Sequence, residues 1–358
     1  MLPDRYARQR ILPGFGNDAQ AALTKARVLV IGAGGLGSTV IPALAAAGVG
    51  TLGIVDDDTV ELSNLHRQLV HGVADIGASK VSSAASTVRA LNPATTVIEV
   101  DARLTRHNAL ELFAQYDLVL DGSDNFATRY LANDAAVLAG LPLVWGAVSQ
   151  YGGQAGVAWQ EKGPTYRDLF PTPPPPGSVL SCAVGGVLPT VCAVIGSIMA
   201  TEAIKIITGV GEPLIGRVTT FDALTGLFRE IRYGRDPDAA PITELIDYEA
   251  FCGVADGISP GELAALLETD PPLLLDVRET WEAEIAVLPG AAVIPLDSLE
   301  AVVGTLDPHA ATVVYCHHGV RSAAALEILR AHGFTAARHL EGGIDAWSRE
   351  IDADVARY

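Results

Sequence analysis

Cys316 begins a short loop, CHHGVRS at 316–322, that contains a glycine and ends in an arginine and a serine. The β-branched run TVVYC precedes this loop, and the helical pattern RSAAALEILRAHG follows it. We therefore expect Cys316 at the end of a strand and Arg321 at the start of a helix. Backbone N–H groups of the turn and the positive end of the helix dipole both stabilise an anionic sulfur. The pattern predicts a reactive thiolate at Cys316.

A second chemical pattern is the glycine-rich segment VLVIGAGGLGS near the start of the chain. Gly32, Gly34 and Gly37 fit G-x-G-x-x-G directly after a predicted strand and at the start of a predicted helix, where backbone N–H groups favour a phosphate. Asp56 ends the next predicted strand and suits a ribose hydroxyl, which is equally true of an NAD enzyme. This motif alone predicts a nucleotide site without naming the nucleotide.

Cations near the glycine motif favour ATP over NAD. Arg67 lies in DDDTVELSNLHRQ at 56–68, and Lys80 follows in GASKV. A hydride-transfer site has little use for several cations near the cofactor phosphates, whereas loss of pyrophosphate develops negative charge that Arg and Lys stabilise. Asp124, in DGSDN at 121–125, could carry Mg²⁺, which prefers carboxylate and phosphate oxygens.

Composition sets the broad class of protein. The chain has 358 residues, of which 49% are hydrophobic, so we expect two domains. The net charge of −18 is spread along the chain and argues against nucleic acid or an anionic membrane as partner. No uncharged apolar stretch of about 18 residues and no signal peptide pattern occurs, which leaves the cytoplasm as the expected compartment. Four cysteines without a CxxC pair predict neither a disulfide framework nor structural zinc.

Strand and helix patterns alternate along the first part of the chain, which predicts an α/β fold with a Rossmann-like, doubly wound parallel sheet. A proline-rich segment interrupts the alternation at 171–178 and is expected to form an extended, exposed crossing. A long apolar helix at 187–209 and a hairpin at 217–233 follow it. The other expected strands lie at 27–32, 51–56, 96–101, 117–123 and 142–148, and the clearest helices at 38–49, 80–91 and 129–140.

A second, smaller α/β unit is predicted after a linker at 242–258. Its expected strands lie at 272–278, 312–316 and 337–343, with a helix at 321–333. The predicted domains are therefore residues 1–241 and 259–358.

Five ordered motifs in the first domain resemble the MoeB/ThiF adenylyltransferases, relatives of the ubiquitin-activating enzymes: RYARQ, GAGGLGS, DDDTVELSNLHRQ, GASKV and DGSDN. The resemblance implies ATP-dependent adenylation of the C-terminal glycine of a ubiquitin-like sulfur carrier protein. It also implies a homodimer in which Arg8 reaches into the neighbouring subunit's site. The implied nucleotide-binding residues, with Asp124 also binding magnesium, are Gly32, Gly34, Gly35, Gly37, Asp56, Ser63, Asn64, Arg67, Lys80, Asp124 and Asn125.

One departure from that family concerns zinc. Family members often hold zinc with two CxxC pairs, but here the first pair corresponds to Thr165 and Asp168, and the second falls in DAAPI at 238–242. We therefore predict no zinc, and we expect packing alone to hold the loop and the C-terminal hairpin of the domain.

The second domain resembles a rhodanese domain through LLLDVRETWEAEIAVLPGAAVIPL, YCHHGVRS and HLEGGIDAW. The resemblance implies a persulfide on Cys316, with Arg321 among the groups that stabilise its outer sulfur, and polar contacts from Asp276 and Arg278. Its persulfide donor would be a cysteine desulfurase or thiosulfate. The implied reaction joins the domains: the Cys316 persulfide attacks the acyl-adenylate, and a second thiol releases the carrier thiocarboxylate.

Cys182, in VLSCAVGG, matches the adenylation-domain cysteine of the MoeB/ThiF family and could release the product or form a thioester. Cys192, among apolar residues, is expected only to pack. Two other functions are considered: an NAD-dependent oxidoreductase with a rhodanese appendage, and a non-catalytic module that delivers a carrier. The sequence does not distinguish molybdopterin or thiamin biosynthesis from other pathways that use such carriers.

Overall fold

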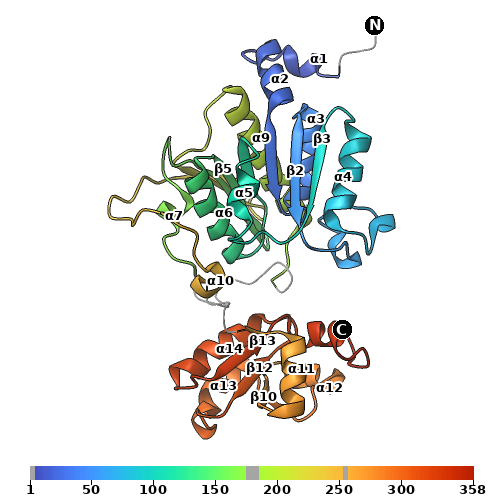
Figure 1. The fold of residues 1–358 in the computed structure, drawn as a ribbon, viewed down its shortest axis with the longest axis vertical. Helices are drawn as coiled ribbons and strands as arrows, with labels where there is room; N and C mark the ends of the chain where they lie inside the picture. Colours follow the sequence, from blue (N-terminus) through green and yellow to red (C-terminus); the bar gives the residue numbers. More distant parts are fainter. Residues whose placement is uncertain (1–4, 175–184, 253–256) are drawn as a thin grey trace. The chain divides into compact units, whose positions relative to one another are not determined.

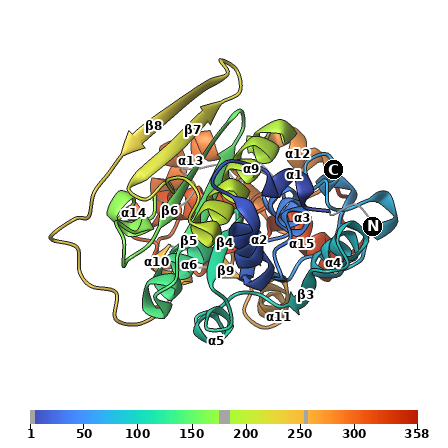
Figure 2. The ribbon, with the colours of Figure 1, turned by 90° about the horizontal axis from the view of Figure 1, so that it is seen from above.

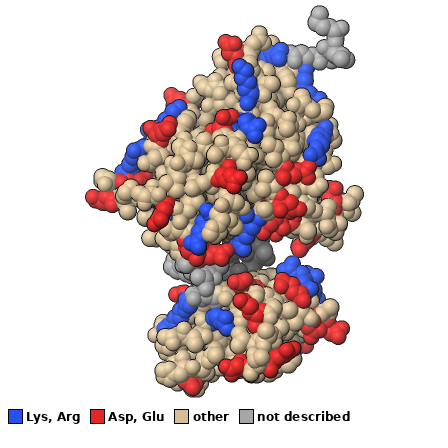
Figure 3. All heavy atoms as spheres, in the orientation of Figure 1, with Lys and Arg blue, Asp and Glu red and all other residues tan. Residues whose placement is uncertain are grey.

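The computed structural model describes residues 5–174, 185–252 and 257–358. The described chain divides into two compact units. The first holds the residues up to Thr172 and Gly185–Tyr248, and the second holds Glu249–Tyr358. On the face drawn in Figure 3, Lys and Arg side chains are interspersed with Asp and Glu over both units.

An eight-stranded sheet forms the centre of the first unit, in the order β3-β2-β1-β4-β5-β6-β7-β8 (Figure 1). The strands from β3 to β5 in this order are parallel, and β6, β7 and β8 are antiparallel to their neighbours. From β1 to β3 successive strands are added on one side of β1, and from β4 onward they are added on its other side. Ligands are therefore expected at this switch point, beyond the carboxyl ends of β1 and β4. The strands are β1 (Arg27–Ile31), β2 (Thr51–Asp56), β3 (Thr96–Asp101), β4 (Leu118–Asp121), β5 (Leu143–Ser149), β6 (Gly152–Ala158), β7 (Arg217–Asp222) and β8 (Leu227–Arg232).

Helices cover this sheet, and the central strands are apolar because they are buried on both faces. α3 and α9 pack against each other and lie side by side in Figures 1 and 2. The helices are α1 (Ala7–Arg10), α2 (Gly16–Lys25), α3 (Gly37–Ala47), α4 (Lys80–Leu91), α5 (Ala109–Phe113), α6 (Phe126–Ala139), α7 (Tyr166–Leu169) and α9 (Pro189–Thr208), with 3₁₀ turns η1 (Leu62–Asn64) and η2 (Val73–Asp75).

α9 is long and apolar enough to cross a membrane by length and composition alone. However, one side of it is part of the main hydrophobic core, where Val191, Ile195, Met199 and Ala203 are buried. α9 also contacts β5 and β6. These contacts make α9 the core helix of this unit.

The second unit contains a five-stranded parallel sheet in the order β11-β10-β12-β13-β9. Leu275 and Val314 face one hydrophobic cluster, and Leu274 and Val313 face the other, because side chains alternate along each strand. α10 (Tyr248–Phe251) begins at the last residue of the first unit and continues into the second. The other elements of the second unit are β9 (Gly257–Ile258), α11 (Pro260–Thr269), β10 (Leu273–Asp276), α12 (Thr280–Ile285), β11 (Ala292–Val293), α13 (Leu296–Val302), η3 (Val303–Thr305), β12 (Thr312–Tyr315), α14 (Val320–Ala331), β13 (Ala337–Leu340) and α15 (Gly343–Glu350).

The predicted α/β class, with a doubly wound sheet followed by a smaller α/β unit, is confirmed. The hairpin predicted at 217–233 is β7 and β8, and the helix predicted at 80–91 is α4. β6 was not predicted, because GGQAGVA has neither alternation nor a β-branched run. The proline segment at 171–178 lies partly outside the described residues.

Candidate functional site

The glycine motif lies between the end of β1 and the start of α3, at the point where the chain order reverses. Gly32 has φ 86°, a left-handed conformation that favours glycine. A β-carbon on Gly37 would lie 2.1 Å from the carbonyl oxygen of Gly32, so the helix can start this close to the strand only with glycine. Gly34 has more space, since its nearest neighbour, Gln68 Nε2, would be 3.7 Å from an added β-carbon.

Asp56 and His71 fix the backbone of Ala33, the second residue of this loop. The Ala33 N–H donates to Asp56 Oδ2 at 2.7 Å, and His71 Nε2 lies 2.9 Å from the Ala33 carbonyl oxygen. His71 Nδ1 contacts Ser83 Oγ on α4 at 2.8 Å. Burial raises the pKa of Asp56 and lowers that of His71. The sequence analysis placed Asp56 here but missed His71, a buried histidine that connects the loop to α4.

Lys80 starts α4 and is almost fully buried. Its Nζ lies 2.7 Å from Asp58 Oδ2, and its backbone N–H donates to the Asp58 carbonyl oxygen at 2.9 Å. The Asp58 side chain is 67% exposed, so this ion pair can exchange with solvent anions. The sequence patterns indicated no role for Asp58. Its position two residues after Asp56 in the same loop was the available signal.

Ser63, Asn64 and Arg67 lie on and just after η1. Asn64 is buried, and its Oδ1 accepts from the Glu61 N–H at 3.2 Å, which caps the 3₁₀ turn. Arg67 Nη1 donates to the Ser63 carbonyl oxygen at 3.2 Å. A β-carbon on Gly35 would lie 3.8 Å from Arg67 Cγ, which places the Arg67 stem beside the glycine loop. The structure thus brings Arg67 to the loop, while Asn64 supports the turn.

The segment 121–125 follows β4 and touches the glycine loop, since a β-carbon on Gly32 would lie 3.2 Å from the Gly122 carbonyl oxygen. Asp121 is fully buried and accepts from the Ser123 N–H and hydroxyl at 2.9 and 2.6 Å. Asn125 Oδ1 caps α6 by accepting from the Thr128 N–H at 2.8 Å. Asp124 is exposed at this edge of the sheet. A single carboxylate there suits Mg²⁺, which takes its other ligands from phosphate and water.

Arg8 is exposed on α1, far from the glycine loop of its own chain. The neighbouring Gln9 donates to the carbonyl oxygen of Ala47 at 3.0 Å, at the end of α3 opposite to the loop. α3 has 11 residues, which correspond to about 16 Å. An arginine in this position does not reach the glycine loop of the same chain.

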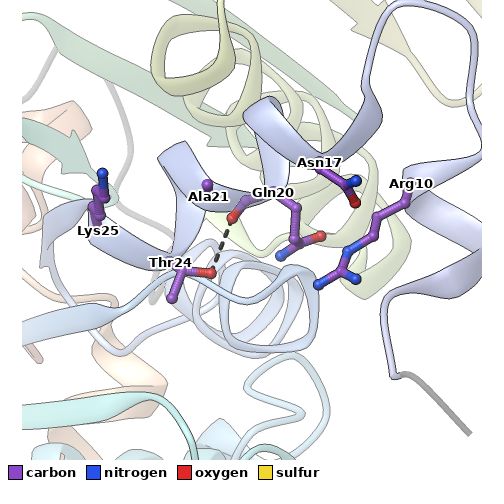
Figure 4. A pocket seen from close by; sticks show the side chains of 6 residues that line it. All are labelled: Arg10, Asn17, Gln20, Ala21, Thr24 and Lys25. Atoms are coloured by element: carbon purple, nitrogen blue, oxygen red, sulfur yellow. Dashed lines mark hydrogen bonds between the residues drawn. The ribbon is translucent and has the colours of Figure 1, made fainter.

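A groove of about 530 Å³ lies along α2 (Figure 4). Gln20, one of its lining residues, also donates to the Ala47 carbonyl oxygen at 3.1 Å. The groove therefore lies at the far end of α3 and is separate from the glycine loop. Its lining residues are Arg10, Asn17, Gln20, Ala21, Thr24 and Lys25.

Cys316 lies directly after β12, as predicted, and is buried. Its Sγ accepts from the Gly319 N–H at 3.1 Å and lies 3.6 Å from Ser322 Oγ. Gly319 has φ 94° and forms the N-cap of α14. The sulfur therefore lies in a turn that offers it a backbone N–H donor at the start of a helix, which is the arrangement expected from the sequence.

The start of α15 holds the cysteine loop through two backbone hydrogen bonds. The N–H groups of Ile344 and Asp345 donate to the carbonyl oxygens of Cys316 and His317 at 2.9 and 3.1 Å. A β-carbon on Gly343 would lie 2.4 Å from both of these oxygens. Only glycine at position 343 permits this approach, which keeps the loop in one conformation.

Arg321 is held by a carboxylate that sequence reasoning missed. Its Nη1 and Nη2 bind Glu282 Oε2 and Oε1 at 2.5 and 2.7 Å. Burial acts to raise the pKa of Glu282, but hydrogen bonds from Arg321 and from the Glu279 N–H outweigh it and lower the pKa to about 2. Arg321 is thus paired with Glu282 and also interacts electrostatically with Cys316, so its role beside an outer sulfur stays a prediction.

Stacked rings lie beside the same loop. His317 stacks on His318 at 3.9 Å and on Tyr358 at 4.2 Å. The Tyr358 hydroxyl accepts from Arg278 Nη1 at 2.8 Å. Arg278 and Asp276 form a fully buried ion pair, so both residues support the domain rather than face a substrate.

Comparison with known proteins identifies the first unit. Residues 6–241 match the ThiF family. The chain belongs to the ThiF family. Residues 259–350 match the rhodanese-like domain, so the ThiF-family unit is followed by a second recognised domain.

Relatives with both domains span nearly the whole chain. "Probable adenylyltransferase/sulfurtransferase MoeZ" of Mycobacterium tuberculosis is 51% identical over 371 residues, covering 99% of this chain and 95% of that protein. "Adenylyltransferase and sulfurtransferase MOCS3" of Xenopus laevis is 39% identical and covers 99% of this chain and 88% of its own length. The prediction of an enzyme with adenylyltransferase and sulfurtransferase activities is confirmed, and the two other functions considered are set aside.

Two further comparisons concern the ThiF-family unit. "Sulfur carrier protein adenylyltransferase" of Thermus thermophilus is 51% identical and covers 70% of this chain and 97% of its own length. The structure of E. coli MccB with ATP has a TM-score of 0.59 and 21% identity, covering 66% of this chain and 73% of that chain. The likeness to MccB shows the fold alone.

The positions of the family's first zinc pair have other roles in this ThiF-family unit. Thr165 and Asp168 cap α7, with the Thr165 hydroxyl donating to Asp168 Oδ2 at 2.9 Å. Asp168 Oδ1 also accepts from the Asp236 N–H at 2.9 Å, and Arg235 Nε donates to the Gly163 carbonyl oxygen at 3.0 Å. The expectation that packing alone holds these segments was wrong, because hydrogen bonds join them.

Two further cysteines were considered from the sequence, Cys182 and Cys192, and the structure describes only the second. Cys192 is buried on α9, and an added β-carbon on Gly35 would lie 2.9 Å from its sulfur, so Cys192 packs beneath the glycine loop. Cys182 lies outside the described residues.

Proposed function

We propose that this enzyme adenylates the C-terminal glycine of a ubiquitin-like sulfur carrier protein and then transfers sulfur to it from a persulfide on Cys316. The observation that carries the proposal is the presence in one chain of two preorganised loops. One is a glycine loop at the switch point of a doubly wound sheet, next to Lys80. The other is a cysteine loop whose sulfur accepts a backbone N–H.

In the first step, a carboxylate oxygen of the carrier attacks the α-phosphorus of ATP, and pyrophosphate leaves. The glycine loop and the start of α3 would bind the phosphates through backbone N–H groups. Lys80 and Arg67 would stabilise the negative charge that develops on the leaving pyrophosphate. Lys80 would exchange Asp58 for phosphate, which the exposure of Asp58 permits. Asp56 keeps Ala33 in place and is expected to accept from the ribose.

Asp124 fits magnesium by its chemistry and by its exposed position beside the glycine loop. Bound Mg²⁺ would neutralise charge on the phosphates. Asn125 would support Asp124 by capping the helix that follows.

A homodimer would supply Arg8 in trans. Arg8 lies near the end of α3 that is opposite to the glycine loop of its own chain. It would therefore act in the nucleotide site of a second copy of the chain. Arginine suits this role because its guanidinium stays charged and binds phosphate oxygens in a fixed geometry.

In the second step, the outer sulfur of the Cys316 persulfide attacks the acyl carbon, and AMP leaves. The product is an acyl disulfide between the carrier and Cys316. A thiolate then attacks Cys316 Sγ and releases the thiocarboxylate. If Cys182 supplies that thiolate, the resulting Cys182–Cys316 disulfide is reduced by an external dithiol for the next turnover. A thioester at Cys182 is the other route.

The persulfide donor would be a cysteine desulfurase or thiosulfate. We propose the cytoplasm as the compartment of this reaction, because a persulfide on Cys316 requires a thiol that is kept reduced.

The decisive experiment incubates the purified chain with ATP, Mg²⁺, thiosulfate and a glycine-tailed carrier. Mass spectrometry of the carrier should show replacement of one oxygen by sulfur, with AMP formed in equal amount. Cys316→Ser should keep carrier-dependent exchange of labelled pyrophosphate into ATP but yield no thiocarboxylate. Absence of AMP with every carrier tested would refute the adenylation step.

A further inference from the structure

In the rhodanese-like domain, both carboxylate oxygens of Glu282, on α12, accept hydrogen bonds. It is 4% exposed and binds both terminal nitrogens of Arg321. It also accepts from the Tyr358 hydroxyl at 3.1 Å and from the Glu279 N–H at 3.0 Å. Four hydrogen bonds therefore hold the carboxylate in place, and Glu282 keeps its negative charge beside the cysteine loop.

This pairing involves a cation that interacts electrostatically with the reactive sulfur. Arg321 directly precedes Ser322, whose hydroxyl lies 3.6 Å from Cys316 Sγ. A carboxylate that binds both terminal nitrogens occupies the side of the guanidinium that would bind an anion. Glu282 and the sulfur donor would therefore compete for the same group.

The other charged groups around the loop are also paired. Arg278 is bound by Asp276, and Asp345 accepts from Arg349 and Arg357 at 3.3 and 2.9 Å. Burial and the neighbouring His318 lower the pKa of His317, so its ring is neutral near pH 7. A small dianion that binds at this loop would therefore compete with carboxylates for Arg278 and Arg321.

On the basis of the proposed function, we propose that Glu282 is a specificity-determining residue that favours a persulfide over thiosulfate as the sulfur donor. With thiosulfate, the Cys316 thiolate attacks the outer sulfur, the S–S bond breaks, and sulfite leaves with the electron pair. With a persulfide, the same thiolate attacks the terminal sulfur, and the donor thiolate leaves. Thiosulfate brings two negative charges and a doubly charged leaving group, so it depends more strongly on an unpaired Arg321.

The experiment measures persulfide formation on Cys316 of the full chain by mass spectrometry, with sodium thiosulfate and glutathione persulfide as separate donors. Neither ATP nor a carrier is present, so a failure of adenylation does not affect the result. Glu282→Gln keeps the shape of the side chain and removes its charge. The matched control is Glu284→Gln, an exposed residue on the same helix.

The unmodified chain should react faster with glutathione persulfide than with thiosulfate. Glu282→Gln should raise the thiosulfate rate relative to the persulfide rate by about tenfold, the effect of one hydrogen bond to a charged group. Glu284→Gln should leave the ratio unchanged. If Glu282→Gln does not fold, Glu282→Asp should shift the ratio in the same direction by a smaller factor. An unchanged ratio in the folded variant, or equal rates in the unmodified chain, overturns the proposal.

Discussion

Lys80 Nζ lies 2.7 Å from Asp58 Oδ2, so a carboxylate holds the cation that is expected to bind the ATP phosphates. The Lys80 side chain is buried and the Asp58 side chain is exposed. Asp58 thereby holds the Lys80 side chain in position, and a phosphate can replace it because Asp58 is exposed. This relationship leads to the first of four predictions.

Asp58→Asn should lower the KM for ATP by about two- to fivefold, because an exposed ion pair stabilises by only about 0.2–1 kcal/mol. Carrier-dependent exchange of pyrophosphate into ATP gives this KM. Asp57→Asn, next to it and also exposed, is the control and should change little. A higher KM for Asp58→Asn would mean that Asp58 positions Lys80 rather than competes for it.

Gly37→Ala should reduce pyrophosphate exchange by about a hundredfold, the typical cost of misplacing a reacting group by about 1 Å. The added β-carbon would lie 2.1 Å from the Gly32 carbonyl oxygen, which forces the loop to move. Gly72→Ala is the matched control, because Gly72 lies outside the glycine motif and its β-carbon would make only an ordinary 3.6 Å contact, with Asp75 Oδ2. Persulfide formation on Cys316 should be normal in both variants. Equal losses at the two glycines would contradict this steric argument.

Asp124→Asn should raise the Mg²⁺ concentration needed for half-maximal pyrophosphate exchange by about tenfold or more. The amide keeps the size of the side chain but loses the charge that a hard cation requires. Titration of Mg²⁺ at saturating ATP measures the effect, and removal of Mg²⁺ by a chelator should abolish exchange in both forms. An unchanged Mg²⁺ requirement would remove Asp124 from the metal site.

Glu282 should make the stability of the rhodanese-like domain depend on pH in the acid range. Its pKa is about 2 in the folded chain against 4.5 for an ordinary glutamate, so the folded state favours the charged form. This contribution is fully present above pH 4.5 and is lost as the pH falls from 4.5 towards 2. Thermal unfolding of the unmodified chain and of Glu282→Gln should show a difference in Tm that shrinks over this range. A constant difference would refute the assignment.

Sequence patterns predicted the elements that depend on local periodicity, and long-range contacts account for most of the rest. β2 and β3 were placed correctly, because runs rich in β-branched residues that end at Asp56 and Asp101 are typical of strands, whether buried like β2 or at the sheet edge like β3. β6 contains three glycines in seven residues and becomes a strand through pairing with β5 and β7.

The same distinction holds for the candidate site. Gly37 and Cys316 could be placed from their neighbours in the sequence. Glu282, however, lies 39 residues from Arg321, and His71 lies 38 residues from Ala33. No local pattern indicates such partners, since they depend on how separate elements pack.

The contact between α15 and the cysteine loop depends on a single glycine, Gly343. Every glycine codon becomes an alanine codon by one base exchange, and the added methyl group would displace the carbonyl oxygens of Cys316 and His317. The first unit lies outside that contact and would continue to consume ATP. A single base change at this codon would therefore separate the two activities of the enzyme: adenylation would continue, while sulfur transfer from Cys316 would be impaired.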